Sequence, residues 1–382
     1  MRSPYLHCFG MCIAMLLFAG FSNAQSGLKL KYKRSTVYAG IEVGSKGVKM
    51  SLVEMARNES KNPDFHIVKD TSVNTDFISF TGESFANTVQ GLTGLYNTAI
   101  KNYGISSDKI FTVVSSGVKV VAEREGKSDW IENLIESFKK VIADPHRKVE
   151  VINPESEARL SHLGIVPDSK RFTTFLIDIG SGNTKGGYFP GPGTDNIKLF
   201  TLDWGTKSIS NAATSRMDQD QSPENYNKQL QRVLAGDADK AVIYAVNVSG
   251  AYNMSDNIAF SGGAAWAVAT LLLPEMLDQP VVPVTYQQVE AFFDQLQNNY
   301  SSLSADVIAS KLQGTDEEKS EVKKAAGTVN KVFDQRAMLA GTGLLLKIMR
   351  QFEGIYDKKQ FYLVKNGQVG WISAYVNETI RK

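Results

Sequence analysis

Residues 175–189 read Phe-Leu-Ile-Asp-Ile-Gly-Ser-Gly-Asn-Thr-Lys-Gly-Gly-Tyr-Phe. An apolar strand leads into one carboxylate, Asp178, and then into a turn of small residues, after which a second strand begins. Successive backbone N–H groups in such a turn can surround an anion. The pattern therefore predicts a β-hairpin whose turn binds a phosphate group, although an Asp before a glycine-rich turn is also common in hairpins that bind nothing.

The same pattern occurs a second time, at residues 41–49. These positions read Ile-Glu-Val-Gly-Ser-Lys-Gly-Val-Lys and align with Ile-Asp-Ile-Gly-Ser-Gly-Asn-Thr-Lys at residues 177–185. Both copies read apolar, acidic, apolar, Gly, Ser, three variable positions and Lys. An acidic hairpin in each half of the chain indicates two related lobes that face each other across a cleft, each with one phosphate-binding turn. The alternative is two unrelated hairpins with glycine turns.

The first 24 residues have the pattern of a secretory signal peptide. Arg2 supplies a positive start, residues 8–21 form a short apolar run, and Ser-Asn-Ala at 22–24 provides a small-residue cleavage site. The run is too short to span a bilayer as a helix. We therefore expect a periplasmic or secreted protein that begins at Gln25 and has no stable membrane anchor after cleavage. An uncleaved anchor is the alternative.

Cysteine content and charge exclude several classes of protein. Both cysteines, Cys8 and Cys12, lie inside the predicted signal peptide, so a disulfide framework is excluded for the rest of the chain. The 42 Lys and Arg against 40 Asp and Glu give a formal net charge of +2, which provides no reason to expect a nucleic-acid partner or a membrane surface. The basic residues within 25–36 predict a solvated N-terminal arm.

Strands and helices alternate along the rest of the chain in an α/β pattern. Residues 37–166 begin with a three-strand meander, continue with alternating helices and strands, and predict the first lobe. The hairpin pattern starts again near Thr173, so residues 167–382 predict a second lobe with a helical C-terminal part, including one long helical segment over 317–352. The polar stretch 215–229 is interpreted as a surface insertion.

Short motifs follow one another in a specific order from Tyr38 to the C-terminus. They are Gly44-Ser45, Val114 to Lys119, Glu155 to Leu160, Asp178 to Lys185, Asp203-Trp204-Gly205, Ser261-Gly262-Gly263, Arg336 with Ala340-Gly341, and Asn366 to Gly370. With these motifs, the chain resembles the exopolyphosphatase and guanosine pentaphosphate phosphatase (Ppx/GppA) family of the actin-like ATPase superfamily. The resemblance implies a two-lobed actin-like (ribonuclease H-like) α/β fold. In this fold each lobe is a mixed five-stranded sheet flanked by helices, with a cleft between the lobes.

The resemblance also implies site residues, which carry over to the matching positions. Glu157 stands in the place of the family's proposed catalytic base, and Asp178 in that of an acidic residue of the catalytic and metal site. Glu42 is the second implied metal ligand, and Mg²⁺ is the expected cofactor. The candidate phosphate-binding residues are Gly44, Ser45, Lys46, Ser116, Lys119, Gly180, Ser181, Gly182, Asn183, Thr184, Lys185, Gly262 and Gly263. The last two open a helix after a strand, where backbone donors can hold an anion, although a Gly-Gly pair is equally a packing device.

Three positions depart from the family pattern. Family members usually have Asp in place of Glu42, three glycines in place of residues 180–182, and Glu in place of Lys185. The last departure reverses a charge at a position implicated in catalysis. A lysine there could bind a phosphate oxygen as a fixed cation, together with Lys46, Lys49 and Lys119, and partly replace a metal. Equally, it could mark a protein that binds a phosphorylated ligand without turning it over.

Three functions are compatible with these observations. The first is an exported phosphohydrolase that removes the terminal phosphate from inorganic polyphosphate, or a related polyphosphorylated anion, by attack of a base-activated water in the interlobe cleft. The second is a catalytically impaired binding or sensor protein with the same cleft. A third, ranked lower, is a secreted apyrase-like nucleoside di- and triphosphatase. The partner is in each case a phosphorylated small anion, and a homodimer is compatible with the pattern.

Overall fold

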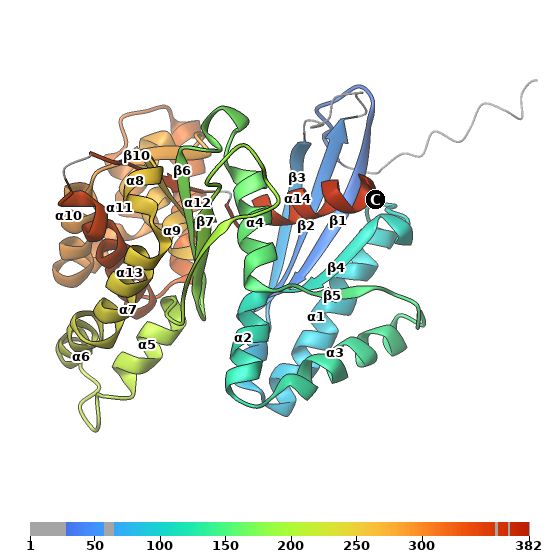
Figure 1. The fold of residues 1–382 in the computed structure, drawn as a ribbon, viewed down its shortest axis with the longest axis horizontal. Coiled ribbons are helices and arrows are strands. Elements are labelled where there is room, and N and C mark those ends of the chain that lie inside the picture. Colours follow the sequence, from blue (N-terminus) through green and yellow to red (C-terminus); the bar gives the residue numbers. More distant parts are fainter. Residues whose placement is uncertain (1–27, 57–64, 356–357, 366, 382) are drawn as a thin grey trace, which may run out of the picture.

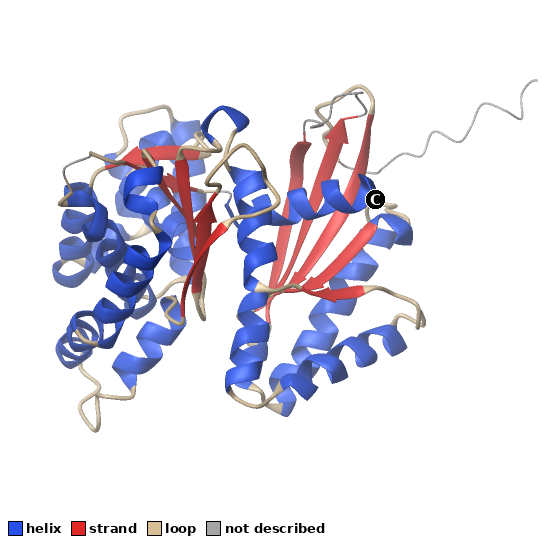
Figure 2. Cartoon of the chain, in the orientation of Figure 1, coloured by secondary structure: helices blue, strands red, loops and turns tan. Residues whose placement is uncertain are grey.

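The computed structural model consists of two α/β lobes that lie side by side (Figure 1). It describes residues 28–56, 65–355, 358–365 and 367–381. Each lobe contains one mixed β-sheet with helices packed against it (Figure 2). The predicted signal peptide lies outside the described residues, as do the first three residues of the predicted basic arm. Within the described ranges, no helix has the length and apolar character needed to span a membrane.

The first sheet joins an antiparallel meander to two parallel strands, in the order β3-β2-β1-β4-β5. Its strands are β1 (Ser35–Val43), β2 (Gly47–Ala56), β3 (Phe65–Asn74), β4 (Ile110–Val114) and β5 (Val149–Val151). Side chains alternate between the two faces of a strand. On β1, Ile41 and its odd-numbered neighbours therefore join the core under α1 (Gly82–Lys101), α2 (Ser116–Arg124) and α3 (Ser128–Val141), whereas Glu42 lies on the opposite face.

The second sheet repeats this plan and adds one strand, in the order β10-β11-β9-β6-β7-β8. Its strands are β6 (Thr174–Ile179), β7 (Thr184–Tyr188), β8 (Lys198–Leu202), β9 (Asn257–Gly262), β10 (Val281–Val284) and β11 (Gln360–Val364). The β6–β7–β8 meander is antiparallel, β9 and β11 are parallel to β6, and β10 pairs antiparallel with β11. The predicted two-lobed actin-like fold is confirmed, with six strands rather than five in the second sheet.

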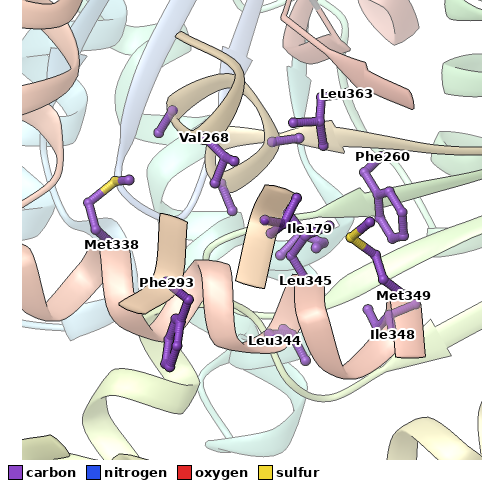
Figure 3. Close-up of a cluster of buried hydrophobic side chains, with 14 of the residues drawn as sticks. Ile179, Phe260, Val268, Phe293, Met338, Leu344, Leu345, Ile348, Met349 and Leu363 are labelled. Carbon is purple, nitrogen blue, oxygen red and sulfur yellow. The ribbon is translucent and has the colours of Figure 1, made fainter. Parts of the chain in front are cut away.

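A large core fills the second lobe beneath its sheet. The helices there are α5 (Thr206–Thr214), α6 (Pro223–Ala235), α7 (Asp237–Ser249), α8 (Ala251–Met254), α9 (Gly263–Leu272), α10 (Tyr286–Asn298), α11 (Ala305–Lys311), α12 (Asp316–Val332) and α13 (Gln335–Glu353). Figure 3 shows side chains of α13, among them Leu345 and Met349, beside strand residues such as Ile179 and Phe260. The core fixes β6 and β9, which carry two of the candidate turns.

Two expectations about this lobe are wrong. The segment 317–352 is not one helix, because the chain extends at Phe333 and Asp334 then caps α13 by accepting a hydrogen bond from the Ala337 N–H over 2.8 Å. The stretch 215–229 is not only a surface insertion. It contains the first half of α6, and the ring of Tyr226 is fully buried in the core.

Two helices, α4 (Pro154–Ile165) and α14 (Gly367–Arg381), pack against each other; α4 lies between the two sheets, and α14 extends from it across the first sheet (Figure 1). They approach closely because Gly164 has no side chain: a Cβ there would lie 1.9 Å from the Gly370 carbonyl oxygen. Trp371 and Tyr375 of α14 pack against β4 of the first sheet. The predicted division at residue 167 assigns this last helix to the second lobe, and the helix contacts β1 and β2 of the first sheet as well as β9 of the second.

Candidate functional site

A cavity of about 290 Å³ lies between the lobes, and both acidic hairpins contribute to its wall. The β1–β2 turn supplies Gly44, Ser45 and Lys46, and the β6–β7 turn supplies residues 180–183. Gly262 and Gly263 line the same cavity where β9 passes into α9. The predicted interlobe cleft is therefore present, and the two copies of the repeated motif face it from opposite sides.

The two turns come close because glycines stand at the points of contact. A Cβ on Gly182 would lie 3.2 Å from the Val121 side chain and 3.8 Å from Ser45 Oγ, across the lobe boundary. A Cβ on Gly117 would lie 3.2 Å from the side-chain oxygen of Asn183. These spaces leave little room for a side chain, so glycine at both positions lets the two lobes lie close together at the bottom of the cleft.

The second turn is held by the start of α5. The backbone N–H groups of Thr206 and Lys207 donate to the carbonyl oxygens of Gly180, at 3.0 Å, and Ser181, at 2.7 Å. The carbonyl oxygens of Gly180 and Ser181 are thus both paired. Ser181 is one of the residues that line the cavity, and its hydroxyl oxygen is buried without a hydrogen-bond partner among the described residues. An unpartnered buried hydroxyl is costly unless a ligand or water satisfies it.

Gly205 is required sterically by this turn. A Cβ at position 205 would lie 2.6 Å from the Gly180 carbonyl oxygen and 2.7 Å from the backbone nitrogen of Asn183. Because backbone atoms cannot turn aside as a side chain can, Gly205→Ala is expected to lower the free energy of unfolding by about 1–3 kcal/mol. Gly193→Ala is the matched control, since a Cβ there meets nothing within 4 Å. Urea unfolding of both variants tests this, and equal stabilities would contradict it.

The centre of the site is a buried cluster of Glu157, Asp178 and Lys185. Asp178 on β6 and Lys185 on β7 lie directly opposite each other in the antiparallel pair. The Lys185 ammonium nitrogen is 3.0 Å from Asp178 Oδ2 and 3.0 Å from Glu157 Oε1. The Lys185 and Glu157 side chains are only 5% and 4% exposed. An ion pair buried this deeply is stable only if the other polar atoms of the charged groups also have hydrogen-bond partners.

The other oxygen of each carboxylate is satisfied as well. The Ser116 N–H, at the start of α2, donates to Glu157 Oε2 over 2.8 Å, and the Ser261 hydroxyl donates to Asp178 Oδ1 over 3.1 Å. Burial alone would lower the pKa of Lys185, but the neighbouring carboxylates of Glu157 and Asp178 outweigh it and raise that pKa above its ordinary value. Lys185 therefore stays an ammonium ion throughout the physiological range of pH.

Glu42 occupies the corresponding place in the first lobe. It lies opposite Lys49 in the β1–β2 pair, and its Oε2 accepts a hydrogen bond from the Trp371 indole N–H over 3.3 Å. Burial raises the pKa of Glu42 from 4.5 to about 7, with Lys49 opposing and Glu157 reinforcing the shift. Glu42 is therefore partly protonated at neutral pH.

This shift predicts a pH-dependent effect of Glu42→Gln on stability. Between pH 4.5 and about 7 the unfolded wild type ionises this carboxyl while the folded protein keeps its proton. Ionisation of Glu42 therefore lowers the wild-type free energy of unfolding as the pH rises, by up to about 1.4 kcal/mol per pH unit. Glutamine removes the loss, so the variant should gain stability relative to wild type from pH 5 to pH 8. Urea unfolding at both pH values tests this, and a constant difference would contradict it.

Most of the predicted site residues line the cavity, and three do not. Thr184 is buried and donates its hydroxyl to the Trp204 carbonyl oxygen over 2.7 Å. Ser116 lies behind Glu157, to which its N–H is bonded. Lys119 points away from the cavity, with its ammonium 3.8 Å from Glu123 and its side chain 35% exposed. The phosphate-binding roles predicted for these three residues therefore gain no support.

Some contacts between the lobes were not predicted by the sequence analysis. Lys207, at the start of α5, forms an ion pair with Asp76 of the first lobe. The Lys46 ammonium lies 5.3 Å from the ring centroid of Phe333, in the second lobe. Of the residues not predicted, only Lys207 could have been noticed in the sequence, because it follows the Trp204-Gly205 motif at a predicted helix start. Asp76 and Phe333 are far away in the chain and gave no such signal.

The donor set does not fit the predicted Mg²⁺ ligands. Within the ranges that the structure describes, no three His, Cys, Asp or Glu side chains form a group that could hold a metal ion. Both oxygens of Asp178 already accept from Lys185 and Ser261. Glu42, the other predicted ligand, is partly protonated at neutral pH. A Mg²⁺ ion at Asp178 would compete with the Lys185 ammonium for Oδ2, so no chemical step is assigned to Mg²⁺.

Two mixed sheets that each turn an acidic hairpin toward a shared cleft define the class of actin-like ATPase folds. More particularly, the chain has the fold of Ppx/GppA proteins. A structure of the Aquifex aeolicus Ppx/GppA family member superposes with a TM-score of 0.59 at 18% identity and covers 91% of this chain and 98% of its own. An exopolyphosphatase from Cytophaga hutchinsonii gives 0.59 at 12% identity, covering 89% and 98%. No protein-family model and no curated protein sequence matches the chain. The comparisons thus establish the fold.

Proposed function

We propose that the chain is a phosphohydrolase that removes the terminal phosphate from inorganic polyphosphate, or from a related polyphosphorylated anion, in the interlobe cavity. One observation carries the proposal: Glu157 lines the same cavity as the two small-residue turns. Phosphoryl transfer needs a positioned water, a base and groups that stabilise charge on the phosphate oxygens. The likeness in fold to an exopolyphosphatase supports the same class of reaction.

In this reaction, each residue of the site would have a separate role. The turn at 180–183 and the Ser181 hydroxyl hold the terminal phosphate, while Lys46 and Lys49 offset the charge of the phosphate chain. Glu157 accepts a proton from a water molecule, whose oxygen attacks the terminal phosphorus. The bond from that phosphorus to the bridging oxygen breaks, and the shortened chain leaves with the bonding electron pair. Lys185 keeps Glu157 in place through its ion pair.

Phosphate release from long-chain polyphosphate, measured in parallel with release from ATP, tests this function. Faster release from polyphosphate would support the proposal. Release from ATP and ADP alone would favour the apyrase-like alternative. Binding of polyphosphate with no release from any substrate would contradict a hydrolytic function.

A second candidate function is a binding protein that does not turn its ligand over. The ion pairs of Lys185 favour it, because Glu157 Oε1 and Asp178 Oδ2 both contact that ammonium and the other two oxygens accept hydrogen bonds. A carboxylate whose two oxygens already accept hydrogen bonds has fewer lone pairs left for a water molecule. Tight binding of polyphosphate without release would establish this candidate.

Export is part of the proposal and rests on the sequence pattern of residues 1–24. A periplasmic or secreted location fits polyphosphate better than a cytoplasmic nucleotide signal. N-terminal sequencing of the protein recovered outside the cytoplasm should begin at Gln25. An N-terminus at Met1 together with recovery in the cytoplasm would contradict export.

A further inference from the structure

The repeated motif places a lysine opposite an acid in each lobe. Glu42 pairs in register with Lys49 on β1 and β2, and Asp178 pairs with Lys185 on β6 and β7. In both hairpins the lysine follows the acid by seven positions, which the turn converts into directly opposed residues. Directly opposed side chains in an antiparallel pair lie close enough to interact. Glu42 and Asp178, the two predicted metal ligands, thus each have a lysine directly opposite on the neighbouring strand.

In the second lobe, the Lys185 ammonium forms ion pairs with two carboxylates. The Lys185 ammonium lies 3.0 Å from one oxygen of Glu157 and 3.0 Å from one oxygen of Asp178, and its side chain is 5% exposed. A single ammonium in contact with two carboxylates satisfies the same electrostatic need as a bound cation. It differs from a metal ion because it is covalently fixed and cannot be removed by a chelator.

The charges that line the cavity show what this lysine does for a polyanionic ligand. Three carboxylates and three ammonium groups line the wall: Glu42, Glu157, Asp178, Lys46, Lys49 and Lys185. The lining is therefore formally neutral when every carboxyl is ionised. A glutamate at position 185 would leave four carboxylates against two ammonium groups, and a polyanion would then need added cations to approach.

We propose that Lys185 is a built-in counter-ion that takes the place of a divalent cation in this cavity, so that the cavity accepts polyphosphorylated anions in their metal-free form. The inference depends on the proposed function in one respect only, namely that the ligand is a polyphosphorylated anion. Metal binding can be measured on the protein alone, without hydrolysis, so the two proposals can fail separately.

Titration of the full chain with Mn²⁺, followed by the electron paramagnetic resonance signal of the free ion, gives the first test. Wild type is expected to bind no Mn²⁺ at this site. Lys185→Glu, which groups Glu157, Asp178 and a third carboxylate, is expected to gain one site. Lys119→Glu makes the same charge change on α2 outside the cavity and should gain none. Stoichiometric Mn²⁺ binding by wild type that is lost in Asp178→Asn would overturn the inference.

Calorimetry with tripolyphosphate gives the second test, and its wild-type measurement alone decides the matter if Lys185→Glu does not fold. Binding should persist in excess EDTA, and Lys185→Glu should weaken it there by at least about tenfold, which corresponds to about 1.4 kcal/mol. Binding that occurs only with added Mg²⁺ would contradict the built-in counter-ion. Binding in EDTA with no phosphate release would reject the proposed hydrolysis and leave the inference standing. If no tripolyphosphate binds under either condition, the proposed function fails and the Mn²⁺ titration decides.

Discussion

Replacing Glu157 with glutamine is expected to lower the rate of phosphate release from polyphosphate by about a hundred- to ten-thousand-fold. The amide cannot take a proton from water, whereas its oxygen can still accept the hydrogen bond that the Ser116 N–H donates to this side chain. The variant also removes one negative charge from the cavity wall, so its affinity for polyphosphate should be at least as high as that of wild type. Initial rates and calorimetric binding, measured on the same preparations, separate the two effects.

The matched control for this variant is Glu155→Gln. Glu155 lies in the same first turn of α4, but its side chain is exposed and does not line the cavity. Its rate of phosphate release should be close to that of wild type. Equal losses in both variants would assign the effect to the helix rather than to the carboxylate of Glu157, and unchanged rates in both would remove Glu157 from the mechanism.

Replacing Lys185 with methionine is expected to lower the free energy of unfolding by about 3–5 kcal/mol at neutral pH. Methionine fills a similar volume but leaves Glu157 without the ammonium that contacts Oε1, and Asp178 without the one that contacts Oδ2. Unpaired carboxylates at this burial are far more costly than the loss of the attraction alone would suggest. Urea unfolding, with the midpoint and slope both compared to wild type, measures the effect.

Lys119→Met serves as the control for this second variant. Its ammonium contacts Glu123 over 3.8 Å on an exposed helix face, and such surface pairs contribute about 0–1 kcal/mol. A Lys185→Met variant as stable as Lys119→Met would show that the two carboxylates find other partners. It would then also weaken the argument that Lys185 serves as their counter-ion.

The two lobes could be predicted from sequence because the information is local and repeated. Each hairpin brings its own apolar alternation, acid, turn and lysine within a few residues, and the second copy confirms the first. The sixth strand, β10, gave no comparable signal, since it is only four residues long and contains Pro283. The break between α12 and α13 depended on one capping residue, Asp334, inside an otherwise continuous helical pattern.

The site was predicted less completely, since its contacts join distant parts of the chain. The sequence suggested that Lys185 would meet a phosphate oxygen, but the structure turns its ammonium toward Glu157, which lies on a separate helix. Likewise, the pair of Asp76 and Lys207 spans 131 positions and crosses the lobe boundary. The docking of Trp371 beside Glu42 requires the last helix to return to the first lobe. No local pattern carries such information.

The central claim is that a polyphosphorylated anion binds between the two turns, and a crystal structure of the chain with tripolyphosphate tests it most directly. We expect one terminal phosphate between the turn at 44–46 and the turn at 180–183, with the Ser181 hydroxyl donating to it and Glu157 on the side from which water attacks. Tripolyphosphate bound at another place, with the space between these turns filled only by water, would contradict the account.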